Sequence, residues 1–352
     1  MRKVLLLALA LGVLLGSKAF ATDKFWVSLG AENEPPNPPI LLMQIDELGN
    51  VTIPPFVAVS VASINRTTVN TDSERSTALS YDSSGNILLF YDLDDDGTVF
   101  RVTINKNTLV PSKPKKILKN LNDPNFLQVT QPSPSILAVG KVDTTPLGFR
   151  GDANGVLTGS SYRLNPRSGP SFSYTMSADG SMEASALDNN NSLRDHIYIQ
   201  PQDANGPLGD PAVVIEHGQQ VEDMDITNLL PNGKRFLVFE DDNTENYFLQ
   251  VLNGVSGDRI GSPILLTSKL DGEVDQQIAI DPQGRFVLFN IADSEVGCTK
   301  SDPVFFQKLD PNSGSPMGIP KQITDCDIYT HFITLGSTDD EGIFGIDILK
   351  VQ

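Results

Sequence analysis

The sequence predicts an all-β chain that closes into a six-bladed β-propeller. A unit made of a strand, a tight turn with Gly and a second, more apolar strand recurs about every fifty residues, and a repeat of this length indicates a modular array. The copies place residues 83–86 before 87–90, 178–181 before Met182, 231–234 before 236–239, and 282–285 before 286–289.

The apolar runs of these units do not alternate with polar residues, as 87–90 and 286–289 show. A strand with one wet face alternates, whereas a strand covered on both faces need not. Strands covered on both faces in an all-β chain require sheets packed on sheets. A propeller provides this arrangement, because each blade lies between two neighbours around a central channel.

A third strand follows each pair. Its mark is an apolar residue, then Gln or Arg, then a short stretch that ends in Asp or Asn. The copies lie at residues 43–46, 100–105, 162–165, 199–203, 249–253 and 306–310. A shorter outer strand follows several of them, as at 264–267.

The copies are offset at the two ends of the chain. The earliest copy of the third strand, at 43–46, has no complete strand pair before it. The last strand pair, at 331–335 and 343–349, has no third strand after it. We therefore expect the C-terminal pair and the N-terminal strands to form one composite blade that closes the ring and removes exposed edges. Residues 25–29 do not fit this count, so a seven-bladed ring is the alternative. A right-handed β-helix is a weaker rival.

The motif Pro/Asp-x-Gly-(Lys/Arg)-Phe, with a downstream apolar-Gln-x-Leu-Asp, resembles the TolB-type and YVTN-type (WD-like) propeller repeats. Its clearest copies are 230–239 with 249–253 and 281–289 with 306–310. The resemblance implies a single propeller domain over residues 22–352. Such families include interaction platforms, periplasmic assembly factors, lactonases and lyases, so the fold alone does not choose a function.

The N-terminus carries the marks of a secretory signal peptide. Arg2 and Lys3 precede an apolar run from Val4 to Leu15, and a small-residue pattern ends at Ala21. The run is too short for a membrane anchor, which needs about 20 apolar residues. We therefore expect cleavage after Ala21, a secreted or periplasmic protein without membrane insertion, and a monomer.

The chain is acidic, with 44 Asp and Glu against 26 Lys and Arg and a net charge of −18. This charge excludes nucleic acid and anionic membranes as partners, and it favours a protein, polymer or cation of opposite charge. Solubility alone is the alternative explanation. With this number of strands in each blade, the loops that follow the second and the fourth strands are expected at the same end of the ring. These loops hold the acid-rich segments of the sequence. These are 92–96, 222–225, 240–242, 271–275, 293–295 and 325–327.

Residues 92–97 match the first half of an EF-hand-type calcium loop. Asp92, Asp94 and Asp96 stand where three ligands converge, and Gly97 follows for the sharp turn. Thr103 occupies the twelfth position, where a bidentate Glu is needed, so this is not an EF-hand. The alternatives are a calcium site at these three residues and a solvated acidic turn.

Two cysteines, Cys298 and Cys326, form one possible disulfide in an exported chain, and two free thiols are the alternative. We favour an exported binding or interaction module that acts through its acidic loop face. The alternative is a lactonase-like hydrolase or lyase with a site at the central channel. His331 and Asp327 would be its catalytic candidates. No cofactor is certain, and calcium is the one candidate.

Overall fold

In a computed structural model of the chain, every regular element within the described residues is a β-strand. The described residues are 22–31, 39–60, 77–93, 97–119, 121, 126–140, 146–164, 173–187, 196–203, 206–216, 221, 223–241, 244, 246–267, 274–291, 303–326 and 343–352. The predicted signal peptide lies outside them. Within these ranges, no helix is long and apolar enough to cross a membrane.

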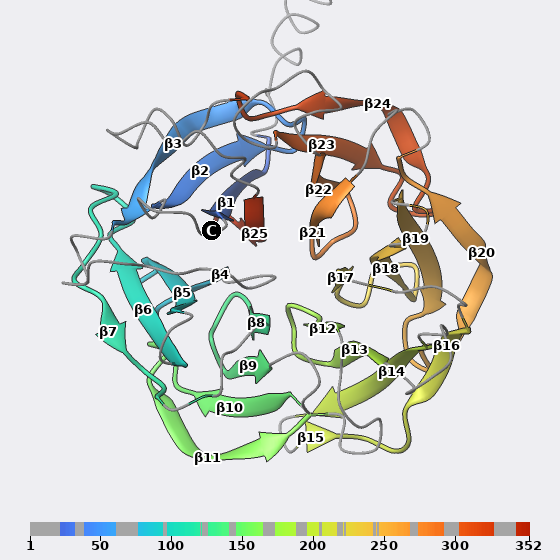
Figure 1. Ribbon diagram of the computed structural model, residues 1–352, viewed down its shortest axis with the longest axis horizontal. Helices are drawn as coiled ribbons and strands as arrows, with labels where there is room; N and C mark the ends of the chain where they lie inside the picture. The colour runs from blue at the N-terminus through green and yellow to red at the C-terminus, as the bar shows by residue number, and fades with distance from the viewer. Residues whose placement is uncertain are drawn as a thin grey trace, which may run out of the picture.

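The strands form six antiparallel sheets, which are the blades of a ring (Figure 1). From the channel outwards, blade 1 holds β25 (Ile343–Lys350), β1 (Lys24–Ala31), β2 (Ile40–Asp46) and β3 (Val51–Val59). Blade 2 holds β4 (Thr77–Tyr81), β5 (Ile87–Leu93), β6 (Thr98–Ile104) and β7 (Lys115–Lys116). Blade 3 holds β8 (Phe126–Val129), β9 (Ile136–Gly140), β10 (Leu147–Gly151) and β11 (Leu157–Arg163).

The remaining blades follow in chain order. Blade 4 holds β12 (Ser173–Met176), β13 (Met182–Leu187) and β14 (His196–Asp203), with β15 (Gly206–Pro207) and β16 (Ala212–Glu216) both paired to β14. Blade 5 holds β17 (Met224–Ile226), β18 (Lys234–Asp241), β19 (Asn246–Asn253) and β20 (Arg259–Leu265). Blade 6 holds β21 (Val274–Ile280), β22 (Phe286–Ile291), β23 (Val304–Leu309) and β24 (Pro316–Gln322).

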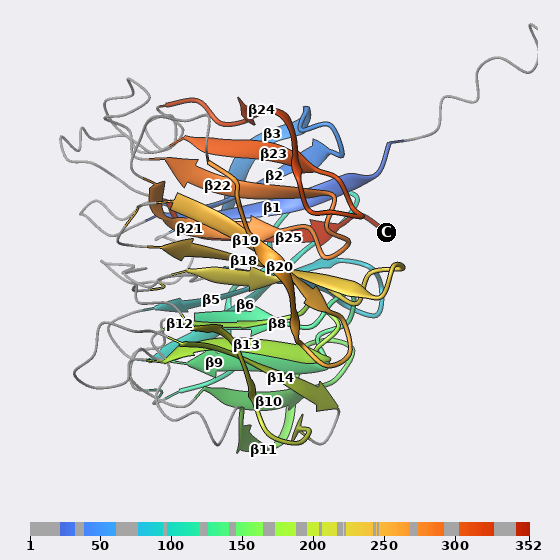
Figure 2. The ribbon, with the colours of Figure 1, turned by 90° about the vertical axis from the view of Figure 1, so that its right-hand side faces the viewer.

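The first strand of each blade contacts the first strand of the next, from β25 through β4, β8, β12 and β17 to β21, and β21 contacts β25 again. The six-bladed propeller is therefore confirmed, and the ring is closed. Figure 2 shows the ring from the side. We call the end that carries the connections between first and second and between third and fourth strands the turn end, and the opposite end the loop end.

The composite closing blade is confirmed, with one change in its composition. β25 alone provides the described C-terminal contribution, and β1 pairs with it on one side and with β2 on the other. The stretch at 25–29 that did not fit the count is therefore part of the second strand of blade 1, not the start of a seventh blade. The other predicted C-terminal strand, at 331–335, lies outside the described residues.

The Gln that marks the third strands has a structural cause. Gln250 on β19 donates from Nε2 to the carbonyl oxygens of Val251 and Ile260, at 2.8 and 3.3 Å, where the pairing with β20 shifts register. Gln307 makes the same bonds to Lys308 and Met317, at 2.8 and 3.1 Å. The amide thus satisfies carbonyl groups that a regular ladder would have paired.

One predicted third strand is wrong. Tyr162 and Arg163 belong to β11, the fourth strand of blade 3, and the third strand of that blade is β10. β10 has the sequence LGFRG, and with the next residue its Phe149-Arg150-Gly151-Asp152 also fits the mark. The Tyr162-Arg163 pair matched the mark by chance, in a strand whose side chains are mostly exposed.

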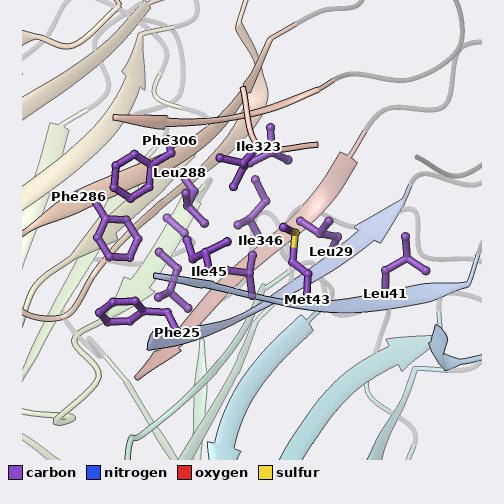
Figure 3. Close-up of a cluster of buried hydrophobic side chains, with 14 residues drawn as sticks. Phe25, Leu29, Leu41, Met43, Ile45, Phe286, Leu288, Phe306, Ile323 and Ile346 are labelled. Carbon is purple, nitrogen blue, oxygen red and sulfur yellow. The ribbon is translucent and has the colours of Figure 1, made fainter. Parts of the chain in front are cut away.

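The core lies between the blades. In the cluster that joins blades 6 and 1, the rings of Phe25 and Phe286 meet edge to face at 4.9 Å, and Phe286 stacks on Phe306 at 4.8 Å (Figure 3). Burial of each ring contributes about 2 to 3 kcal/mol. Gly284 has a φ of +68°, and a Cβ there would lie 2.8 Å from Phe236 Cδ2, so this turn requires glycine.

Candidate functional site

The inner wall of the channel consists of the first strands, and its carboxylates join neighbouring blades. Asp223 Oδ2 accepts a hydrogen bond from the Ile278 backbone N–H at 2.5 Å, and Asp225 Oδ2 accepts one from Ile280 at 2.8 Å. Asp225 Oδ1 also accepts one from the Thr175 hydroxyl at 3.1 Å. These two residues therefore tie β17 to both neighbouring inner strands.

Other blades are joined in the same way. Asp347 on β25 accepts from the Leu79 N–H at 2.6 Å, which ties blade 1 to blade 2. Ser80 donates from Oγ to the Thr130 carbonyl at 2.9 Å, which ties blade 2 to blade 3. The inner-wall carboxylates Asp223, Asp225 and Asp347 are thus held in place by backbone N–H groups, as a structural role requires.

A cavity of about 330 Å³ lies at the turn end of the channel. Turn residues of blades 3 to 6 and the last residues of the chain line it. These are Gln131, Pro132, Ala178, Asn228, 281–283, Arg285 and 349–352. Its size falls within the range of small-ligand sites.

Hydrogen bonds between successive turns fix the rim of this cavity. Gln131 N donates to the Ala178 carbonyl at 2.6 Å, and Asn228 N donates to the Pro282 carbonyl at 3.0 Å. Asn228 Oδ1 accepts from Asp179 N at 2.7 Å. Gln131 also donates from Nε2 to the Ile348 carbonyl on β25 at 2.9 Å. The rim is therefore built by the fold before any ligand arrives.

Four charged residues, Asp23, Asp281, Arg285 and Lys350, form what we call the mouth cluster. Arg285 donates from Nε and Nη2 to the two oxygens of Asp281, at 2.6 and 3.0 Å. Arg285 Nη1 and Lys350 Nζ donate to the same oxygen of Asp23, at 2.6 and 2.5 Å. The Arg285 guanidinium also lies over the Phe25 ring at 4.6 Å. The cluster therefore links blade 6 to the two terminal segments of blade 1.

Asp23 and Arg285 of the mouth cluster keep their charges at neutral pH. The hydrogen bond from Lys350 is the main cause that lowers the pKa of Asp23, burial opposes it, and Arg285 adds to it. Burial disfavours the charge on Arg285, but the hydrogen bonds and charges of Asp281 and Asp23 outweigh burial and raise its pKa. Both carboxylates are thus engaged by cations.

The predicted site residues are only partly within the described chain. Asp92 is buried at the end of β5, while Asp94 and Asp96 lie outside the described residues. The catalytic candidates His331 and Asp327 also lie outside them. Within the described ranges, no three His, Cys, Asp or Glu side chains are grouped to hold a metal ion. The calcium site therefore stays a prediction.

The predicted disulfide is also only partly within the described residues. Cys298 lies outside the described residues, and Cys326 is half-buried, with its Sγ 3.9 Å from the Nε2 of Gln322.

His196 is described, and its ring stacks on Tyr198 with the ring centroids 6.2 Å apart. Its neighbour Asp195 and the third histidine, His217, lie outside the described residues.

The acid-rich segments lie at the ends of second strands or after second or fourth strands, as the strand count predicts. Residues 92–96 and 240–242 begin in the last residues of second strands and continue into the connections to third strands, where 293–295 also lie. Residues 325–327 follow a fourth strand, while 222–225 and 271–275 run into the first strands β17 and β21. However, Asp223 and Asp225 belong to the inner wall and not to a surface loop. Asp241 and Glu240 are buried at the end of β18, while Asp325 is exposed after β24.

The mouth cluster was not among the predicted site residues. Arg285 was read only as a turn residue after Gly284, and Asp23 and Lys350 stand far apart in the sequence. The sequence feature that could have indicated this cluster is Arg285, a basic residue in a turn between first and second strands of an acidic chain. Ring closure then brings the two ends of the chain to it.

No family model matches this sequence, and no curated protein matches it. Among solved structures, the chain is similar to the periplasmic gluconolactonase of Pseudomonas aeruginosa, with 13% identity, a TM-score of 0.51, and coverage of 94% of this chain and 100% of that one. It is also similar to a putative 6-phosphogluconolactonase from Bacteroides uniformis, with 13% identity, a TM-score of 0.50, and coverage of 86% and 82%.

TolB from Acinetobacter baumannii is matched as well, with 14% identity, a TM-score of 0.49, and coverage of 96% of this chain and 70% of that one. Identities this low establish a common fold and nothing finer. The β-propeller fold that the repeat predicts agrees with the two matches that have TM-scores of 0.51 and 0.50.

Proposed function

We propose that this protein is an exported binding module and that a cationic partner, either a protein or a polymer, meets the acid-rich loop end of the ring. The observation that carries the proposal is the strand order. Five of the six acid-rich segments lie wholly or partly in connections from second to third or from fourth to first strands, and these connections leave the ring at one end. The sixth, 222–225, contributes Asp223 and Asp225 to the inner wall. Such a one-sided field steers a partner of opposite charge.

The described channel supports binding over catalysis. Its inner-wall carboxylates accept backbone hydrogen bonds from neighbouring blades, so they serve the fold. The signal-peptide pattern supports export, and a similar propeller bears the name of a periplasmic enzyme, which favours a periplasmic or secreted location.

Photo-cross-linking tests where the partner binds. A photoreactive side chain would replace Thr244 or Asp325 at the loop end, and Asn232 or Asn312 at the turn end would serve as matched positions, all four being exposed. We expect a protein or polymer adduct from the loop-end positions in the exported fraction of the producing cells, and a loss of that adduct in high salt, because salt screens exposed charges. Equal adducts from both ends would contradict the proposal.

The second candidate is a hydrolase or lyase with its site in the channel. Its support is the fold match to a gluconolactonase over nearly the whole of both chains. The purified protein would be assayed for acid release from a sugar lactone. Turnover that disappears in Asp327→Asn or His331→Gln, with unchanged thermal stability, would favour the enzyme over the binding module.

A further inference from the structure

The cavity at the turn end lies at the opposite side of the ring from the proposed partner surface, and it has the features of a separate small-ligand site. The residues around it include the apolar Pro132, Ala178, Pro282, Leu349 and Val351. The volume of about 330 Å³ lies at the lower end of the range for small-ligand sites, so a ligand of about ten non-hydrogen atoms fits it.

The polar groups around the cavity include donors and acceptors. Both oxygens of Asp281 already accept from Arg285. Gln131, Gln283 and Gln352 each carry an amide oxygen that can accept. The Lys350 ammonium has three N–H groups, and its contact within the described chain is with Asp23. Asn228 uses its oxygen to accept from Asp179, which leaves its amide N–H groups available to a ligand. Lys350 and Asn228 can therefore both donate to an acceptor on a ligand.

Charge points to the same class of ligand. Lys350 lines the cavity and its side chain is 41% exposed, so its ammonium can turn towards a ligand while it stays near Asp23. Arg285 stands behind it with a guanidinium fixed by two carboxylates. An anionic oxygen in the cavity would gain the charge-assisted hydrogen bond from Lys350, and apolar atoms would fill the rest.

From these observations we propose that the turn-end cavity binds a small monocarboxylate with a compact apolar body. Its carboxylate meets Lys350 and the Asn228 amide, and its apolar part packs against Pro132, Ala178 and Pro282. The rim needs no rearrangement, because hydrogen bonds between successive turns already fix it. A pre-formed site of this kind avoids part of the entropic cost of binding.

Benzoate is a suitable probe and benzamide is its uncharged analogue, and calorimetric titration of the full-length mature protein measures both. We expect saturable benzoate binding with a Kd of about 1 mM, and binding of benzamide at least about fivefold weaker. Lys350→Met removes the charge, and Ala178→Leu fills the cavity without touching a charge. Each is expected to weaken benzoate binding by at least about fivefold.

Lys234→Met is the matched control, because Lys234 lies at the turn end, donates to the Asn312 carbonyl at 3.0 Å, and does not line the cavity. This variant should bind benzoate as the unmodified protein does. The proposal is overturned if no titration saturates up to about 20 mM, if Lys234→Met weakens binding as much as Lys350→Met, or if benzamide binds as well as benzoate. Because Ala178→Leu keeps every charge of the mouth cluster, it decides the result if Lys350→Met unfolds the protein.

Discussion

Three carboxylates at the turn end, Asp46, Asp82 and Asp152, bond within their own turns, whereas those of the inner wall bond to the next blade. Asp46 Oδ1 accepts from the backbone N–H groups of Leu48 and Asn50, both at 2.9 Å. Asp82 and Asp152 repeat this geometry in their own turns. Asp223, by contrast, accepts from Ile278, which lies 55 residues further along the chain.

The difference separates local from long-range joints. A turn carboxylate stabilises a few residues that are already close in sequence. An inner-wall carboxylate fixes two blades that approach each other only when the ring forms, and it is buried there, as Asp223 is at 2% exposure. We therefore expect the two classes to differ in their effect on global stability.

The largest expected effect comes from Asp223→Ala. The substitution leaves the N–H groups of Ile278 and Met224 without their carboxylate acceptor in a buried joint, and each such group costs about 1 to 3 kcal/mol. We expect a loss of about 4 kcal/mol in the free energy of unfolding, measured by urea denaturation. Asp46→Ala is the matched turn variant, and it should cost about 1 kcal/mol. Equal losses would mean that the two classes of carboxylate do not differ.

A second test uses a joint at the turn end that titrates. The Tyr81 hydroxyl donates to the Lys350 carbonyl at 3.0 Å and so ties blade 2 to β25. Burial is the main cause that raises the pKa of Tyr81 to about 12. The unfolded chain ionises near pH 10, so this contribution is complete below pH 10 and is lost as the pH rises to about 12.

The loss amounts to roughly 2 to 3 kcal/mol at pH 12. Other tyrosines, among them Tyr162 and Tyr174, also have raised pKa values, so the measurement is the difference between the unmodified protein and Tyr81→Phe. Urea unfolding from pH 8 to 12 should show a steeper decline for the unmodified protein. Parallel curves would show that the ionisation of Tyr81 does not weaken this joint.

The same contrast explains what could be predicted from the sequence. The turns and the buried second strands are local patterns, so the repeat predicted the six blades and the closing blade. The mark was informative where Gln250 and Gln307 fill a register shift. It misled in blade 3 because both β10 and β11 carry an apolar residue followed by Arg, and the copy in β11 was chosen. Local chemistry therefore identified most third strands and failed in the blade where two strands fit the mark.

The joints and the mouth cluster depend on long-range contacts. Asp223 and Asp225 looked like surface acids because their partners are 55 residues away. Asp23 and Arg285 are 262 residues apart, and only ring closure brings them together. Residue types and their spacing in the sequence do not reveal pairs that are so far apart. The sequence therefore predicted the acidic loop end but not the mouth cluster at the turn end.

The smallest expected effect concerns the acidic hairpin of blade 2, which differs from the turn at Asp82. Asp92 pairs with Val99 and Leu93 with Thr98, so residues 94–97 connect the hairpin strands β5 and β6. We propose that Asp92, Asp94 and Asp96 bind calcium weakly, with a Kd of about 1 mM, because three carboxylates close together in the sequence attract the cation but the pattern lacks a complete ligand set.

Terbium luminescence tests this hairpin. The signal should disappear in Asp94→Ala and persist in Asp325→Asn, which removes an exposed acid elsewhere at the loop end. At a calcium concentration ten times the Kd, we expect a gain of about 1.4 kcal/mol in the free energy of unfolding. If terbium gives no signal, or if Asp94→Ala keeps it, the acids of this hairpin bind no cation. In that case they serve the loop end only as charge, in contrast to Asp46, Asp82 and Asp152 at the turn end, which each hold a turn.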